Sequence, residues 1–176
     1  MENSKEIRFS EESLALVKKI IARYPEGKQK SALIPLLHLA QAEFDGWLSP
    51  EVMAYVASLL DIQPVEAYEV ASFYSMFNLK PVGKCVIEVC RTSSCWLVGA
   101  EDIVNHIERK LGIKNGQTSA DGMFTLKTVE CLGSCGTAPM LQCGAKYHEQ
   151  LTIEKVDNLL DSLRTENKRK TYLDKV

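Results

Sequence analysis

The stretch VCRTSSCWLVG, residues 89–99, contains Cys90 and Cys95 with four residues between them. It overlaps the end of KCVIEVC, residues 84–90, a short run rich in β-branched residues that is typical of a strand. The residues between the two cysteines are arginine, threonine and serines, and threonine and serine are common in loops. The sequence therefore predicts a strand that ends at a polar loop carrying two thiols.

A second stretch repeats this arrangement forty residues later. VECLGSCGTAP, residues 129–139, holds Cys131 and Cys135 with three residues between them, and it follows a second predicted strand over residues 123–131. Its glycines permit backbone angles that other residues avoid, and its small side chains let backbone N–H groups approach a bound group. Because neighbouring parallel strands end at the same edge of a sheet, we expect the four thiols to converge.

Four converging thiolates have two main uses in proteins. They are the usual ligands of an iron–sulfur cluster. Structural zinc also takes four cysteines, most often with two residues between the members of a pair, so the spacings here favour a cluster and leave zinc open. The chain has no C-x-x-C motif of the thioredoxin redox type. Cys85 and Cys143 stand outside both loops, and we interpret them as buried packing residues.

The composition is that of a globular chain with a core of its own. Of 176 residues, 45% are hydrophobic and 25% are charged, so disulfides are not needed for stability. The net charge of −2 argues against general nucleic-acid binding, which requires a basic surface. No apolar stretch reaches the roughly 20 residues of a membrane span, and the N-terminal residues do not resemble a signal peptide. We therefore expect a cytoplasmic protein without a direct membrane span.

No motif for catalysis by this chain alone is present. The sequence has no P-loop, no G-x-G-x-x-G and no Ser/His/Asp set. The three histidines, His38, His106 and His148, lie outside both cysteine loops, which excludes a Rieske pattern. We predict no catalytic residue.

The chain divides into three parts by pattern. Residues 1–80 have the apolar periodicity and capping signals of a small helical bundle, with helices expected after Ser10, after Ser49 and in two further segments. Residues 81–164 predict the order strand, helix, strand, strand, strand, helix, which is an α/β fold compatible with a thioredoxin-like layer. Residues 165–176 lack periodicity and are predicted to be a flexible tail.

The quoted motifs also carry a family resemblance. The segment VCRTSSCW, the polar loop that ends in ADGMFTL, and the segment VECLGSCGTAPM resemble the thioredoxin-like [2Fe–2S] subunit of NADH-quinone oxidoreductases, the respiratory complex I enzymes. Residues 30–81, which include DGWLSPEVMAYVASLL, are similar to the family's helical N-terminal region. The resemblance extends over about residues 12–164.

This resemblance implies a site and a role. It implies that Cys90, Cys95, Cys131 and Cys135 ligate one [2Fe–2S] cluster within a thioredoxin-like ferredoxin domain. It also implies a partner flavoprotein subunit that carries FMN and the NADH site, with which the cluster exchanges single electrons. Trp96 is then expected to shield the cluster, to meet the partner or to pack in the core.

The resemblance further implies an assembly. The chain would be an oxidoreductase subunit without a complete active site of its own, bound to other peripheral-arm subunits of complex I at the cytoplasmic face of a bacterial inner membrane. An equivalent subunit of an NAD-linked hydrogenase or formate dehydrogenase is the alternative with the same chemistry. A redox-inert, zinc-binding interaction module is the alternative from another class.

Overall fold

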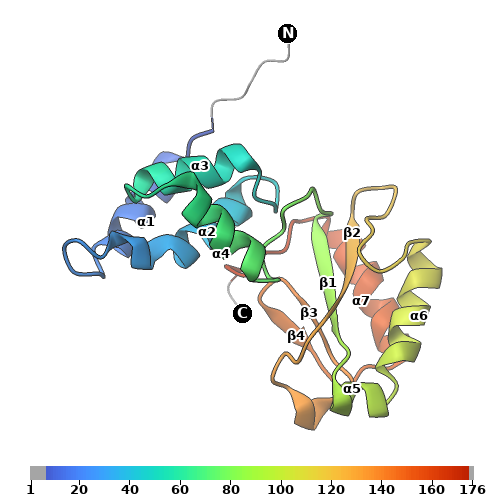
Figure 1. Cartoon of the computed structure of the whole chain (residues 1–176). Helices are drawn as coiled ribbons and strands as arrows, with labels where there is room; N and C mark the ends of the chain where they lie inside the picture. The colour runs from blue at the N-terminus through green and yellow to red at the C-terminus, as the bar shows by residue number, and fades with distance from the viewer. Residues whose placement is uncertain (1–6, 175–176) are drawn as a thin grey trace. The chain divides into compact units, whose positions relative to one another are not determined.

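A computed structural model of the chain describes residues 7–174 (Figure 1). The ends of the predicted helical region and of the predicted tail, residues 1–6 and 175–176, lie outside this range. The chain divides into two compact units, residues 1–81 and 82–176. Within residues 7–174, no helix combines the length and the apolar character that a bilayer crossing requires.

The first unit consists of helices where the sequence predicts them. They are α1 (Glu11–Ile21), α2 (Leu33–Glu43), α3 (Pro50–Leu59) and α4 (Pro64–Phe73), with a 3₁₀ turn over Gln29–Ala32 before α2. Their buried side chains form a core of their own, centred on α2 and α3.

The predicted capping signals of these helices are confirmed. The hydroxyl oxygens of Ser10 and Ser49 accept hydrogen bonds from backbone N–H groups in the first turns of α1 and α3. Pro50 and Pro64 occupy the first positions of their helices, where a missing N–H group costs little. Pro35 lies in the first turn of α2, as predicted.

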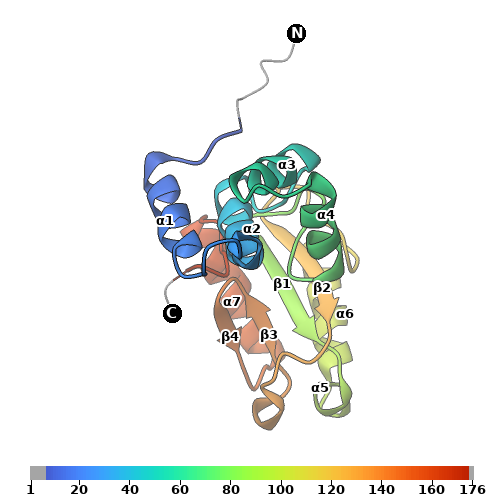
Figure 2. The same cartoon turned by 60° about the vertical axis from the view of Figure 1, so that its left-hand side comes forward.

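The second unit is built on a four-stranded mixed sheet with the order β2-β1-β3-β4 (Figure 2). The strands are β1 (Cys85–Cys90), β2 (Phe124–Val129), β3 (Leu141–Cys143) and β4 (Lys146–His148). The strands β1 and β2 are parallel, whereas β3 is antiparallel to both β1 and β4. The α/β class and the order of elements along the chain are those that the sequence predicts, including the hairpin next to Cys143.

Two long helices cover one face of this sheet. The helix α6 (Ala100–Leu111) provides the crossover between the parallel strands, and α7 (Ile153–Glu166) follows β4. The side chains of Ile87, Phe124 and Leu141 point to this face and form the core of the unit with apolar residues of both helices. The sheet thereby holds the ends of β1 and β2 in a fixed register.

One element differs from its prediction. The sequence predicts a loop over residues 91–95 after β1, but Ser93–Leu97 forms a short helix, α5. Thr92 has an extended backbone at its N-cap, and Gly99, with a φ of 95°, separates α5 from α6. Without glycine or proline between Ser93 and Leu97, nothing in the local sequence interrupts the turn.

The residues after α7 make contacts that the sequence pattern does not reveal. The backbone N–H of Lys170 donates to the carbonyl of Lys84 at 2.8 Å. The Tyr172 hydroxyl donates to a carboxylate oxygen of Glu88, which is buried on the sheet face opposite the core. Burial raises the pKa of Glu88, and the Tyr172 hydrogen bond opposes this effect.

Replacing Tyr172 by Phe should reduce the free energy of unfolding by about 1–3 kcal/mol, because the buried Glu88 carboxyl loses a hydrogen-bond donor. Denaturant titration of the purified chain measures this change. The matched control is Tyr68→Phe, since the Tyr68 side chain is exposed on α4. Equal stabilities of the Tyr172→Phe variant and the parent protein would show that the contact between Tyr172 and Glu88 contributes nothing.

Candidate metal centre

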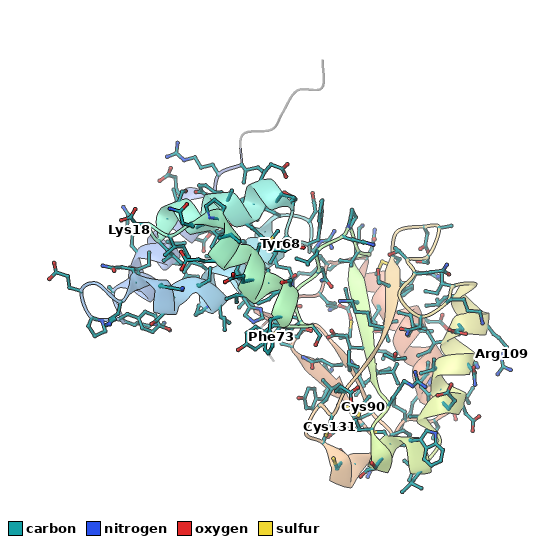
Figure 3. All side chains as sticks on the ribbon, in the orientation of Figure 1. Lys18, Tyr68, Phe73, Cys90, Arg109 and Cys131 are labelled. Atoms are coloured by element: carbon teal, nitrogen blue, oxygen red, sulfur yellow. The ribbon has the colours of Figure 1, made fainter. Side chains whose placement is uncertain are left out.

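The parallel pairing of β1 and β2 brings the two cysteine-bearing loops to one edge of the sheet. Cys90, the last residue of β1, lies opposite Val129, the last residue of β2. Each loop begins directly after its strand, so both leave the sheet side by side. Figure 3 shows the labelled Cys90 and Cys131 together at this end of the unit. The predicted convergence of the loops is therefore what the structure shows.

The first pair of thiols is buried. Cys90 at the end of β1 and Cys95 in α5 pack in a small apolar cluster with Ala100 and Met140. The two thiols lie close enough for each to shift the pKa of the other. The short helix α5 therefore turns Cys95 back toward the end of β1, which an extended loop would not do.

The second pair of thiols is exposed. The Sγ atoms of Cys131 and Cys135 lie 3.4 Å apart. The backbone N–H of Gly133 donates to Cys131 Sγ at 3.4 Å. Gly133 has a φ of 83°, a conformation that glycine adopts without the steric cost of a Cβ atom. The glycine that the sequence singles out thus allows a backbone donor to reach sulfur.

Polar contacts between the loops join the two pairs. The Thr92 hydroxyl of the first loop lies 3.3 Å from Cys90 Sγ, and it also lowers the pKa of Cys131 in the second loop. The Ser94 hydroxyl contacts Cys135. In the other direction, the backbone N–H of Leu132 in the second loop lowers the pKa of Cys90. These contacts run both ways and hold all four thiols in one constellation.

Within each pair, the pKa of one thiol is lowered and the pKa of the other is raised. Burial raises the pKa of Cys90, but hydrogen bonds from Thr92, Cys95 and Leu132 outweigh it, so the net pKa is lowered. Burial, followed by the interaction with Cys90, raises the pKa of Cys95 to about 11.

The second pair behaves in the same way. The Gly133 N–H, followed by the Cys135 thiol, lowers the pKa of Cys131, and donation to Cys131 raises the pKa of Cys135. Each pair thus combines one thiol whose pKa is lowered with one whose pKa is raised. Binding of a metal centre would displace the thiol protons, because cysteine ligates metals as the thiolate.

This donor set fits a [2Fe–2S] cluster. Four sulfur ligands are the usual complement of such a cluster. Here they form two close pairs, which suits a group with two metal atoms, and N–H and O–H donors surround them. In the described range, residues 7–174, no three His, Cys, Asp or Glu side chains are grouped so as to hold a single metal ion.

The remaining residues singled out by the sequence lie elsewhere. Cys85 and Cys143 are buried in the sheet, where their thiols hydrogen-bond to each other, so they pack in the core as expected. Trp96 is not a core residue, because 60% of its surface is exposed on α5. His38 and His148 are half-buried and lie outside both loops.

Two residues near the site have no counterpart in the sequence analysis. Tyr147 of β4 donates its hydroxyl hydrogen to the carbonyl oxygen of Leu132 at 2.6 Å. The Glu149 carboxylate accepts hydrogen bonds from Ser134 and, at 2.5 Å, from the hydroxyl of Thr137. Hydrogen bonds from Ser134 and Thr137 lower the pKa of Glu149. Both contacts depend on how the β3–β4 hairpin folds back on the second loop, and no local motif signals this.

The sequence of residues 17–164 matches the family of thioredoxin-like [2Fe-2S] ferredoxins. The chain belongs to this family. Its cofactor is therefore a [2Fe–2S] cluster, and the resemblance stated from the motifs is confirmed.

Curated relatives agree with this assignment, and the two from Rickettsia are covered over nearly their whole length. The E subunit of the NADH-quinone oxidoreductase of Rickettsia bellii is 46% identical over 158 residues, which cover 90% of this chain and 95% of the relative. The protein of the same name from Rickettsia felis is 49% identical over 153 residues, or 87% and 92% of the two chains. The mitochondrial NADH dehydrogenase [ubiquinone] flavoprotein 2 of Dictyostelium discoideum is 46% identical over 156 residues, or 89% of this chain and 63% of the relative.

Solved structures support the fold. A chain of an NAD⁺-reducing [NiFe]-hydrogenase in the air-oxidised state aligns with a TM-score of 0.66 at 22% identity. The alignment covers 76% of this chain and 23% of the hydrogenase chain. This likeness extends to the α/β architecture and does not by itself carry the hydrogenase's activity to this chain.

Replacing Glu149 by Ala should accelerate loss of the cluster about tenfold, because residues that support metal ligands typically affect metal affinity by about 10–100-fold. The change frees Ser134 and Thr137, which flank Cys135. The decay of visible absorbance under anaerobic chelator challenge measures this rate. Glu154→Ala, a change at an exposed glutamate in the first turn of α7, is the control. The expectation is wrong if the Glu149→Ala and Glu154→Ala variants lose absorbance at the same rate.

Proposed function

We propose that this chain is the electron-transfer subunit of an NADH dehydrogenase and that Cys90, Cys95, Cys131 and Cys135 hold its [2Fe–2S] cluster. The observation that carries the proposal is the pairing of the four thiols at one edge of the sheet, where polar groups of each loop shift the pKa of thiols in the other. When bound, the cluster supplies a centre that accepts and releases one electron at a time.

The chain's own residues hold and shield this centre and perform no acid–base chemistry. The apolar cluster around Cys90 and Cys95 excludes water from one side, and backbone and hydroxyl donors face the thiolates. NADH oxidation releases two electrons together, so a flavin is needed to pass them on singly. We assign that flavin, an FMN, and the NADH site to a partner flavoprotein subunit.

This chain has a surface beside the cysteines to which the flavoprotein could bind. Trp96, Leu97 and Val98, at and just beyond the end of α5, are 60%, 74% and 54% exposed. Three consecutive exposed apolar side chains form a patch that water solvates poorly, and such patches commonly mark protein interfaces. The patch follows directly after Cys95, so a flavoprotein bound there comes close to the cluster. Proximity is required because the rate of electron transfer falls steeply with distance.

The names of the relatives support a proposal for the assembly. The two Rickettsia proteins are named as parts of NADH-quinone oxidoreductase, so we assign this chain to the peripheral arm of such a complex, together with other arm subunits, on the cytoplasmic face of a bacterial inner membrane. The NAD⁺-reducing hydrogenase structures favour a second assembly with the same chemistry, in which an equivalent subunit serves a hydrogenase. Co-purification with native partners distinguishes the two assemblies.

Anaerobically purified protein should contain two irons and two sulfides per chain and give a one-electron EPR signal after dithionite reduction. Cys131→Ser should abolish or severely destabilise this cluster, because it removes a thiolate that has no nearby replacement in its loop. Cys143→Ser should retain it, since Cys143 lies in the sheet core and contacts Cys85.

Two results would contradict the proposal. One zinc per chain and no EPR signal would identify a redox-inert zinc module. Loss of the iron in Cys143→Ser, with iron retained in Cys131→Ser, would show that the ligand set is wrong.

The double change Trp96→Ser and Leu97→Ser should weaken binding to the co-expressed flavoprotein subunit by at least about tenfold, because exposed aromatic anchors often dominate interface energy. Iron content should not change, since neither side chain contacts the cysteines through a polar group. Ile153→Ser, at an exposed apolar residue of α7, is the control. Undiminished affinity of the double variant would exclude this patch as the docking surface.

A further inference from the structure

The peptide group between Leu132 and Gly133 connects Tyr147 to a cluster-binding cysteine. Its carbonyl oxygen, on Leu132, accepts the hydroxyl hydrogen of Tyr147 at 2.6 Å. Its N–H, on Gly133, donates to Cys131 Sγ at 3.4 Å. One planar peptide therefore lies between a phenol and a sulfur ligand, with a hydrogen bond at each end.

We propose that Tyr147 is a positioning residue that raises the reduction potential of the cluster through this peptide. The inference rests on the proposed ligand role of Cys131. It assigns to a tyrosine outside both cysteine motifs a role in setting how readily the centre accepts an electron.

The physical link is the polarisation of the peptide. Hydrogen bonds in a chain strengthen one another, because a donor at the carbonyl oxygen draws electron density from the nitrogen and makes its N–H a better donor. The hydrogen bond from Gly133 to Cys131 therefore gains strength when the Tyr147 hydroxyl is present. The same contact fixes the plane of the peptide and so the direction of its N–H.

The sign of the effect follows from charge. Reduction adds an electron to the cluster and its thiolates, so hydrogen bonds donated to sulfur stabilise the reduced form more than the oxidised form. Hydrogen bonds to sulfur are one of the recognised determinants of cluster potential. Strengthening the Gly133 N–H donor therefore raises the potential, and removing the Tyr147 hydroxyl lowers it.

The sheet explains how Tyr147 reaches the loop. In the β3–β4 hairpin, Tyr147 pairs with Gln142, whereas the flanking His148 and Lys146 pair with Leu141 and Cys143. Because side chains alternate along a strand, Tyr147 projects from the sheet face opposite the helices. Its side chain is 42% exposed. The ring therefore does not depend on its hydroxyl to fill a core site, and phenylalanine can replace it without leaving a cavity.

The test is an EPR-monitored redox titration of the full chain with its cluster bound. Tyr147→Phe should give a lower reduction potential than the parent at equal iron and sulfide content. Tyr68→Phe, which removes an exposed hydroxyl on α4, should leave the potential unchanged. An unchanged potential in Tyr147→Phe, with the cluster retained, overturns the proposal, because a purely structural contact would change stability and not potential.

A second substitution tests the opposite direction and does not depend on the stability of Tyr147→Phe. Site-specific incorporation of 3-fluorotyrosine at position 147 keeps the ring and the hydroxyl but makes the hydroxyl a stronger donor while it remains protonated. The potential should rise above that of the parent. An unchanged or lower potential would contradict the proposed relay.

Iron and sulfide content tests the ligand assignment independently of the role of Tyr147. A parent protein without two irons and two sulfides per chain would refute the cluster site itself. A parent with an intact cluster, whose potential is insensitive to both substitutions at position 147, would refute only the role of Tyr147.

Discussion

The parallel pairing of β1 with β2 is the constraint on which the site depends. It places Cys90 opposite Val129, so the two cysteine loops begin at the same level on the same edge of the sheet. The register is fixed by the core, because a shift of one residue would turn Ile87 and Phe124 away from the helices and toward the other face. Burial of these apolar side chains on the face covered by α6 and α7 thereby positions four thiols at and just beyond the ends of β1 and β2. The position of the thiols at the edge of the sheet therefore depends on the packing of its core.

Two sets of hydrogen-bonding groups surround the thiols, one in contact with sulfur and one in contact with the second cysteine loop. Thr92, Ser94 and the N–H groups of Leu132 and Gly133 contact sulfur directly. Tyr147 and Glu149 then hold the second loop from the hairpin. This second set explains how an exposed loop keeps a defined shape: its carbonyl and hydroxyl groups are engaged by side chains anchored in the sheet or next to it. A loop without such anchors would have to be ordered by its metal centre alone.

The sequence predicts the fold and the convergence of the cysteine loops well for identifiable reasons. Caps such as Ser49 followed by Pro50, the apolar periodicity of α6 and the placement of each cysteine pair after a strand are local signals, and the structure agrees with them. The short helix α5 escapes prediction because five residues are too few to show periodicity. The sequence does not predict the contacts of Tyr147, Glu149 and Tyr172 for another reason. Each of these residues contacts a residue 12 to 84 positions away, and these contacts exist only after the sheet has formed.

The two thiol pairs differ in exposure, and this difference bears on how the proposed assembly works. Cys90 and Cys95 are enclosed by the chain's own apolar residues, whereas Cys131 and Cys135 face solvent. Water competes with the Gly133 N–H for the exposed sulfur and raises the local dielectric, so this hydrogen bond acts below its full strength in the chain by itself. A flavoprotein bound at Trp96 and Leu97 would extend toward the exposed pair and displace that water. The chain thus supplies the enclosed half of the site, and the proposed partner completes the enclosure where electrons must pass between the two proteins.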